Sequence, residues 1–122
     1  MTVDALDHYT LRTADLDATV DFYVEVMGLR NGERPAFAFP GAWLYSGNAP
    51  VVHLVGVEGE VEAGTGAIDH VAFRASDLDA YAKCLTERRI PFERRQVPGR
   101  PLRQLFLTDP NGVRIELNFW DE

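Results

Sequence analysis

The three histidines of this chain, with one glutamate near its end, occupy positions that correspond between two halves of the sequence. LDHYTLRTADLDA, from Leu6 to Ala18, is repeated as IDHVAFRASDLDA, from Ile68 to Ala80. Seven of the thirteen positions are identical, whereas chance gives about one match at ordinary residue frequencies. We therefore interpret the two stretches as copies of one module, in which His8 corresponds to His70.

A second pair of corresponding positions lies at the far end of each half. Aligning WLYSGNAPVVHL with LFLTDPNGVRIEL requires one inserted residue and sets His53 opposite Glu116. Two or three imidazoles with one carboxylate are a typical ligand set for Fe(II), Mn(II), Zn(II), Ni(II) or Co(II). The four positions therefore predict a divalent metal site. The alternative is symmetric packing, which an imidazole serves poorly because a buried ring must find polar partners.

Each copy of the repeat predicts a strand followed by a helix. Residues alternate between two faces in the opening segments, which is the period of a β-strand, and this places His8 and His70 at equivalent points on equivalent strands. The first helix is expected between an N-cap at Asp15 and a stop at Gly28. The second is expected from residue 77 to about residue 89.

Strand-like runs follow each predicted helix. They are AFAF, AWLY and VVHLVG in the first half, and PFERRQV, RQLFLT and VRIELNF in the second. The predicted fold class is α+β, with two tandem βαβββ modules. We expect a single domain, with module one over about residues 4–58, a linker over about 59–66 and module two over about 67–120.

The composition narrows the classes of function. The chain has 122 residues and a net charge of −7 without a long basic run, so nucleic acid is not expected as a partner. Cys84 is the only cysteine, which leaves no partner for an internal disulfide and no cysteine-based metal site. No segment approaches the roughly 18 apolar residues of a membrane span. We therefore expect a cytoplasmic protein without membrane association.

Four segments resemble the vicinal oxygen chelate superfamily, namely LDHYTL, DLDATVDFYVEVMGL, IDHVAF and DPNGVRIELNF. This superfamily includes glyoxalase I, methylmalonyl-CoA epimerase, fosfomycin-resistance transferases, extradiol dioxygenases and bleomycin-resistance proteins. The resemblance covers nearly the whole chain. It implies a curved, cup-like sheet around one divalent metal, usually in a homodimer, with His8, His70 and Glu116 as ligands. The implied substrate is a small molecule that chelates the metal through two oxygens.

The resemblance leaves the reaction open, and His53 distinguishes the alternatives. In extradiol dioxygenases a histidine near this place stays off the metal and acts as acid or base, so we favour a dioxygenase-like reaction. Phe106 departs from the tyrosine that those enzymes carry before the turn to the last ligand. One alternative is a glyoxalase- or epimerase-like lyase or isomerase, with His53 as the fourth ligand. Another is a metal-free drug-binding protein that resembles bleomycin-resistance proteins.

Further residues are candidates for contact with the substrate. The rings of Trp43 and Tyr45 are candidates for the wall of an apolar pocket, with core packing as the alternative. Arg103 is a candidate partner for a substrate carboxylate. Thr10 and Asn118 lie two residues from candidate ligands on the same strand face, so we expect them to support those ligands.

Overall fold

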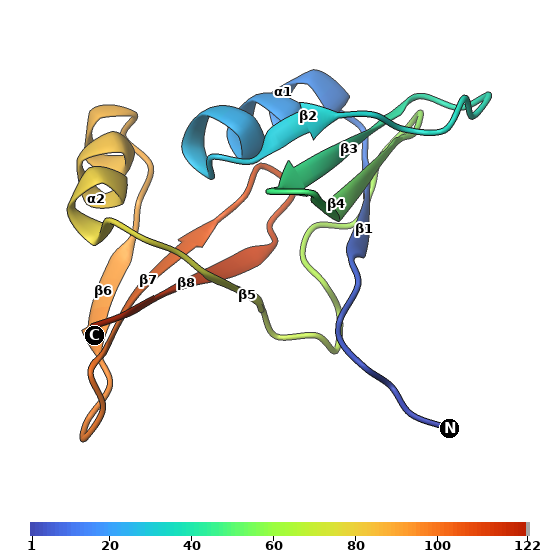
Figure 1. Ribbon diagram of the computed structural model, residues 1–122. Helices are drawn as coiled ribbons and strands as arrows, with labels where there is room; N and C mark the ends of the chain where they lie inside the picture. The colour runs from blue at the N-terminus through green and yellow to red at the C-terminus, as the bar shows by residue number, and fades with distance from the viewer. Residues whose placement is uncertain (122) are drawn as a thin grey trace. The chain divides into compact units, whose positions relative to one another are not determined.

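The structure, a computed structural model, describes residues 1–121. The chain divides into two compact units, Met1–Val61 and Glu62–Glu122, and each unit contains one four-stranded mixed sheet (Figure 1). Both units follow the order strand, helix, three strands. The predicted α+β fold of two tandem βαβββ modules is therefore confirmed.

The first unit orders its strands β1-β4-β3-β2, with β1 parallel to β4 and the other neighbours antiparallel. The helix α1 contacts β3 and β4. The elements are β1 (Tyr9–Thr13), α1 (Leu16–Asp21), the π-helical segment η1 (Phe22–Val26), β2 (Arg30–Gly32), β3 (Gly41–Ser46) and β4 (Ala49–Gly56).

The second unit repeats this arrangement with the order β5-β8-β7-β6, in which β5 is parallel to β8. Its helix is a regular α-helix that contacts the sheet through Tyr81, whose ring meets Phe119 edge-on at 5.8 Å between centroids. The elements are β5 (Val71–Arg74), α2 (Leu78–Glu87), β6 (Glu93–Gln96), β7 (Leu102–Thr108) and β8 (Arg114–Trp120).

The aspartate of each repeated DLDA caps a helix. The carboxylates of Asp15 and Asp77 accept hydrogen bonds from the backbone N–H of Ala18 and Ala80, at 3.0 and 3.1 Å. Each bond satisfies a backbone donor that has no partner within the helix. The predicted cap at Asp15 is confirmed, and Gly28 with φ 82° follows the helical region as predicted.

The first helix differs from the prediction in its second half, which widens into η1. The N–H of Met27 bonds to the carbonyl of Phe22, five residues earlier. In this wider turn Phe22, Tyr23, Val26 and Met27 are all buried, and its π-helical geometry differs from the regular helix that the sequence predicted.

One face of each sheet is buried and the other carries the candidate site. In the first unit the buried side chains alternate with half-buried ones, as Leu44 alternates with Trp43 and Tyr45 on β3. In the second unit Ile115, Leu117 and Phe119 are buried. We call the opposite side, which bears His53 in the first sheet and Glu116 in the second, the open face of each sheet.

The strand predicted at AFAF is wrong. Residues 33–40 form an irregular loop between β2 and β3, in which the N–H of Phe37 bonds to the nearby carbonyl of Pro35 at 2.8 Å. Pro35 and Pro40 bracket the loop, and proline cannot donate to a strand ladder. The edge strand β2 instead begins at Arg30, shortly after the helical region.

The two repeated histidines lie just before their strands rather than within them. The strand β1 begins at Tyr9 and β5 begins at Val71, so His8 and His70 each precede the first paired residue. Their positions remain equivalent in the two units. Among residues 1–121 we find no helix that is long and apolar enough to cross a membrane.

Candidate functional site

The strand register places His53 and Glu116 at equivalent points of the two sheets. Thr10 on β1 is paired with His53 on β4, and Ala72 on β5 is paired with Glu116 on β8. Thr10 and Ala72 are themselves corresponding residues of the repeat. The register therefore reproduces the correspondence that the hairpin alignment predicted. The four candidate ligands form two pairs, His8 with His53 in one unit and His70 with Glu116 in the other.

An aspartate fixes the imidazole of each repeated histidine. The Nδ1 atom of His8 lies 2.6 Å from Asp7 Oδ2, and Nδ1 of His70 lies 2.7 Å from Asp69 Oδ2. Since an ionised carboxylate only accepts, Nδ1 carries the proton and the lone pair of the neutral ring is on Nε2. The hydrogen bond to His70 lowers the pKa of Asp69, which keeps that carboxylate ionised.

A carboxylate on the far nitrogen is the usual support of a histidine that ligates a metal. Sequence reasoning assigned no role to Asp7 and Asp69. The available signal was the dipeptide Asp-His, which both copies of the repeat contain.

The first pair forms an aromatic stack, which we call the first half-site. The rings of His8 and His53 are 3.7 Å apart between centroids and 10° from parallel. On the other side, the ring of Trp43 lies 4.0 Å from that of His53, at 14°. The Nε2 atom of His53 donates to the carbonyl of Pro50 at 3.0 Å, which leaves the lone pair of the neutral ring on Nδ1. Burial, followed by the nearby charge of His8, lowers the pKa of His53.

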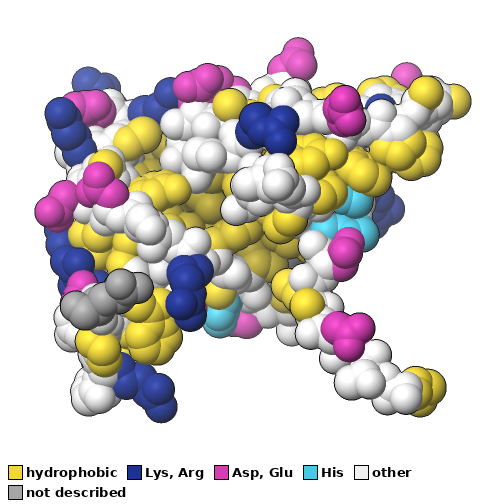
Figure 2. All heavy atoms as spheres, in the orientation of Figure 1, with side chains coloured by type: hydrophobic (Ala, Val, Ile, Leu, Met, Phe, Trp, Pro, Cys, Tyr) yellow, Lys and Arg dark blue, Asp and Glu magenta, His cyan; other side chains and the backbone are white. Residues whose placement is uncertain are grey.

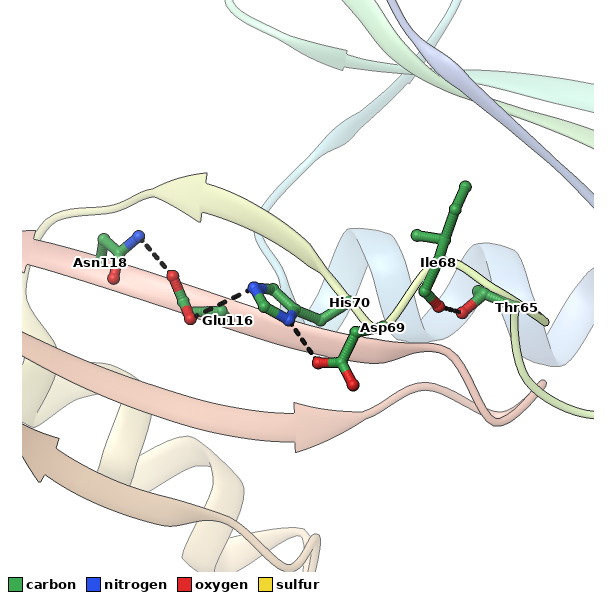
Figure 3. A network of polar contacts seen from close by, with 6 residues as sticks. All are labelled: Thr65, Ile68, Asp69, His70, Glu116 and Asn118. Atoms are coloured by element: carbon green, nitrogen blue, oxygen red, sulfur yellow. Dashed lines mark hydrogen bonds and ion pairs between the residues drawn. The ribbon is translucent and has the colours of Figure 1, made fainter.

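The second pair belongs to a chain of polar contacts, which we call the second half-site (Figure 3). The Nε2 atom of His70 lies 3.5 Å from Glu116 Oε1. The amide of Asn118 donates to Glu116 Oε2 at 2.8 Å, and Gln104 Nε2 donates to the oxygen of Asn118 at 3.0 Å. One carboxylate oxygen of Glu116 is thus occupied by Asn118, and the other faces His70.

The donor atoms of the second half-site fit a divalent metal. Two donors that are 3.5 Å apart can both bind one ion with bonds of about 2.0–2.2 Å, and Nε2 of His70 is the nitrogen that Asp69 leaves with a lone pair. Within either unit, residues 1–121 include no group of three or more His, Cys, Asp or Glu side chains that is arranged to hold a metal. Each unit by itself offers a pair of donors.

The remaining predicted site residues have different surroundings. Thr10 is exposed next to His53 in the register, and Trp43 packs on the His53 ring. The hydroxyl of Tyr45 donates to the Glu33 carbonyl at 2.6 Å. Thr10 and Trp43 therefore lie next to His53 in the first half-site, and Tyr45 contacts the loop between β2 and β3.

The other two predicted residues belong to the second unit. Asn118 is part of the second half-site. Arg103 forms an ion pair with Asp121 at 3.0 Å, and it lies on β7 next to Gln104 rather than in the second half-site. Sequence reasoning missed Gln104, because its role depends on the pairing of Gln104 with Asn118 across two strands.

Phe106 has the place in the second sheet that Trp43 has in the first. Trp43 is paired with His53, and Phe106 is paired with Glu116. The guanidinium groups of Arg95 and Arg114 lie 4.7 and 4.8 Å from the centre of the Phe106 ring. The Phe106 ring therefore contacts two guanidinium groups, whereas the Trp43 ring stacks on an imidazole.

A family model with the description Glyoxalase/Bleomycin resistance protein/Dioxygenase superfamily matches residues 5–117. The chain belongs to this superfamily. It is 30% identical over 120 residues to the Arabidopsis thaliana protein named Glyoxylase I 4, covering 93% of this chain and 69% of that protein. It is 31% identical over 122 residues to lactoylglutathione lyase of Haemophilus influenzae, covering 89% of this chain and 87% of the relative.

The fold of the superfamily is also found among solved structures. A glyoxylase/bleomycin resistance protein/dioxygenase domain from Frankia sp. EAN1pec has a TM-score of 0.81, with 17% identity over 98% of this chain and 100% of that chain. At this identity the likeness concerns the fold alone. The resemblance expected from the repeated segments and the hairpins is therefore confirmed at the level of the superfamily.

Proposed function

We propose that the chain is a divalent-metal-dependent, glyoxalase-like lyase whose substrate offers two oxygens on neighbouring carbon atoms. The observation that carries the proposal is the repeated Asp–His pair, in which each aspartate leaves the Nε2 lone pair of its histidine available. In this proposal His8, His70 and Glu116 hold the metal. When bound, the metal would act as a Lewis acid that polarises the oxygens of the substrate.

The choice of a lyase follows from the relatives. Lactoylglutathione, after which the Haemophilus influenzae relative is named, is a 2-hydroxy thioester with its hydroxyl and carbonyl oxygens on adjacent carbons. In the lyase direction a proton leaves the hydroxyl-bearing carbon and a proton returns to the carbonyl carbon. The C–S bond then breaks to give a thiol and a 2-oxoaldehyde. The dioxygenase-like reaction favoured from the sequence has no comparable support among these relatives.

His53 is the proposed proton acceptor, and the stack supports a position off the metal. An imidazole binds a metal in the plane of its ring, about 2.0–2.1 Å from the nitrogen. The rings of His8 and His53 are nearly parallel at 3.7 Å, so lone pairs that lie in these two separate planes do not converge on one metal ion. If His8 binds the metal, His53 therefore keeps Nδ1 available as a base. Its hydrogen bond to the carbonyl of Pro50 holds the ring in that orientation.

Metal titration with a thioester assay tests the proposal. Protein purified without a histidine tag is titrated with Co²⁺, Ni²⁺ and Zn²⁺ by calorimetry. The metal-loaded forms are then incubated with glutathione and a 2-oxoaldehyde, which is the favourable direction of the lyase equilibrium, while the gain in thioester absorbance is followed. We expect one metal per chain and thioester formation that requires it. The absence of binding by all three metals would overturn the proposal. Metal-dependent oxygen uptake with a catechol, without thioester turnover, would support the dioxygenase instead.

A further inference from the structure

Trp43 extends the imidazole stack of the first half-site by a third ring. The three rings of His8, His53 and Trp43 are nearly parallel, with separations of 3.7 and 4.0 Å between neighbouring centroids. One face of the indole covers His53. A molecule bound beside Trp43 would therefore lie close to the proposed base. Aromatic side chains are common in the walls of ligand pockets, and tryptophan is enriched at interfaces.

An open cavity of about 370 Å³ lies on the surface beside Trp43, and this volume is within the range of ligand pockets in proteins. It is bounded by the irregular loop between β2 and β3 and by the strand β3. Its lining residues are Glu33, Arg34, Pro35, Trp43 and Tyr45.

The loop next to this cavity is built around one arginine. The guanidinium of Arg34 lies 5.1 Å from the ring centre of Phe37 and 5.1 Å from that of Phe39, and its Nη2 donates to the Phe39 carbonyl at 2.8 Å. Both phenylalanines remain 44% exposed. Hydrophobic side chains adjoin histidine atoms on the face shown in Figure 2. The loop thus holds aromatic groups in a fixed arrangement without burying them in the core, which is typical of a binding surface.

The chemistry of these walls favours a flat aromatic group as the occupant. Both an indole ring and a guanidinium plane stack on aromatic rings. A compact cation is disfavoured by Arg34 and an anion by Glu33, whereas a neutral planar ring avoids both conflicts. A second copy of the chain is the other candidate occupant, but nothing in the cavity selects a protein side chain over a small ring. Direct contact between Trp43 and the proposed base favours the substrate itself.

We propose that Trp43 and the adjacent cavity form a subsite for a planar aromatic group of the substrate, joined by a short spacer to the two oxygens. The inference names the substrate class of the proposed lyase and rests on that function. The spacer is required because the indole separates the cavity from His53. Stacking on Trp43 should favour an aromatic ring over a saturated ring of the same size by roughly two- to tenfold in Kd.

Fluorescence of Trp43 tests this subsite separately from metal binding and turnover. The chain has two tryptophans, so the variant Trp120→Phe leaves Trp43 as the only one. This variant is titrated with 2-hydroxy-4-phenylbutyrate and with its saturated analogue 2-hydroxy-4-cyclohexylbutyrate, both with Zn²⁺ and with a chelator. We expect the phenyl compound to quench the fluorescence and to bind two- to tenfold more tightly than the cyclohexyl compound. Calorimetry should show this preference lost in Trp43→Leu and partly retained in Trp43→Phe.

The outcomes separate the subsite from the enzyme. Equal affinity for the two compounds in metal-loaded protein would overturn the subsite and leave the proposed lyase intact. Phenyl preference in a protein that binds no metal would support the subsite and overturn the lyase. Fluorescence that changes with protein concentration, and not with either compound, would assign the cavity to a second copy of the chain and overturn the subsite.

Discussion

The two halves of the chain share one strand register and carry different chemistry on it. At the position of His53 the second sheet has Glu116, and at that of Trp43 it has Phe106. Gly41 is paired with Val55 in the first sheet, and Gln104 is paired with Asn118 at the equivalent positions of the second sheet. A stack of rings therefore surrounds the first candidate ligand pair, whereas a chain of hydrogen bonds surrounds the second.

This difference follows directly from the side chains at equivalent places. Val55 and Gly41 cannot donate or accept through their side chains, so the first sheet has no counterpart of the contact between Gln104 and Asn118. Conversely, Phe106 meets guanidinium groups instead of an imidazole. What the halves retain in common is the Asp–His pair. The two modules therefore share the histidine and its aspartate and differ in the side chains at the neighbouring positions of their sheets.

The largest expected effect concerns His53. In His53→Gln we expect kcat to fall by about 100- to 10,000-fold, the range of general acid–base catalysis, while metal affinity stays near that of the parent. Glutamine can still donate to the carbonyl of Pro50 but cannot accept a proton. The thioester assay gives kcat, and calorimetry gives metal affinity.

His8→Gln is the matched control within the same stack. It should lose metal affinity, because His8 is a proposed ligand. If His53→Gln loses metal affinity to the same extent, His53 is a fourth ligand and the distinction between the two stacked rings fails.

Removal of the charge on Glu116 should weaken metal binding by at least about 100-fold. This loss is larger than the usual loss of affinity when a residue that only hydrogen-bonds to a metal ligand is replaced. Glu116→Gln keeps the size of the side chain and removes the anionic ligand. Calorimetric titration with Zn²⁺ measures the loss. Glu93→Gln is the control, since Glu93 is exposed and forms an ion pair with Arg95. Equal metal affinity in both variants would contradict a ligand role for Glu116.

We expect the hydrogen-bonded chain from Gln104 through Asn118 to orient the carboxylate of Glu116. Gln104 donates to the oxygen of Asn118, which turns the amide nitrogen of Asn118 towards Glu116. In Gln104→Glu the new carboxylate only accepts, so the amide turns over and presents its oxygen to Glu116. We expect a loss of about ten- to hundredfold in metal affinity.

Gln104→Met separates orientation from packing. Methionine removes the donor without requiring Asn118 to turn over, so its loss in affinity should be smaller than that of Gln104→Glu. The absorption spectrum of bound Co²⁺ should shift in Gln104→Glu and stay close to that of the parent in Gln104→Met. Identical spectra and affinities in both variants would argue against an orienting role.

The sequence was sufficient for features that depend on local patterns and on the repeat. The duplicated DLDA predicted the cap at Asp15, and the hairpin alignment predicted that His53 corresponds to Glu116. Both follow from residue spacing along the chain. The superfamily followed as well, because its segments occur in order across both modules.

The features that the sequence did not predict depend on three-dimensional contacts that residue types and spacing do not specify. Phe37 and Phe39 alternate as in a strand, but they lie in a loop between prolines that Arg34 stabilises. The π-helical turn after Asp21 contains apolar residues that a regular helical turn would also accommodate. Gln104 gains its role only through cross-strand register. The dimer and the cytoplasmic location stay predictions.

The smallest expected effect concerns the feature that the two halves share. Asp7→Asn and Asp69→Asn should each weaken metal binding by about tenfold, at the lower end of the range for supporting residues, because both carboxylates are largely exposed. An asparagine oxygen can still accept from Nδ1 but lacks the charge that increases the basicity of Nε2.

The loss of metal affinity in these two variants should be present at neutral pH. His70 lowers the pKa of Asp69, so the stabilising contact is complete above the ordinary carboxyl range and is lost only as pH falls through the lowered pKa. Calorimetry at neutral pH should give similar losses for both variants, and nitrogen NMR should show whether each ring keeps its proton on Nδ1. A loss confined to Asp69→Asn would mean that only the second half-site holds the metal, and the two Asp–His pairs would then no longer be functionally equivalent.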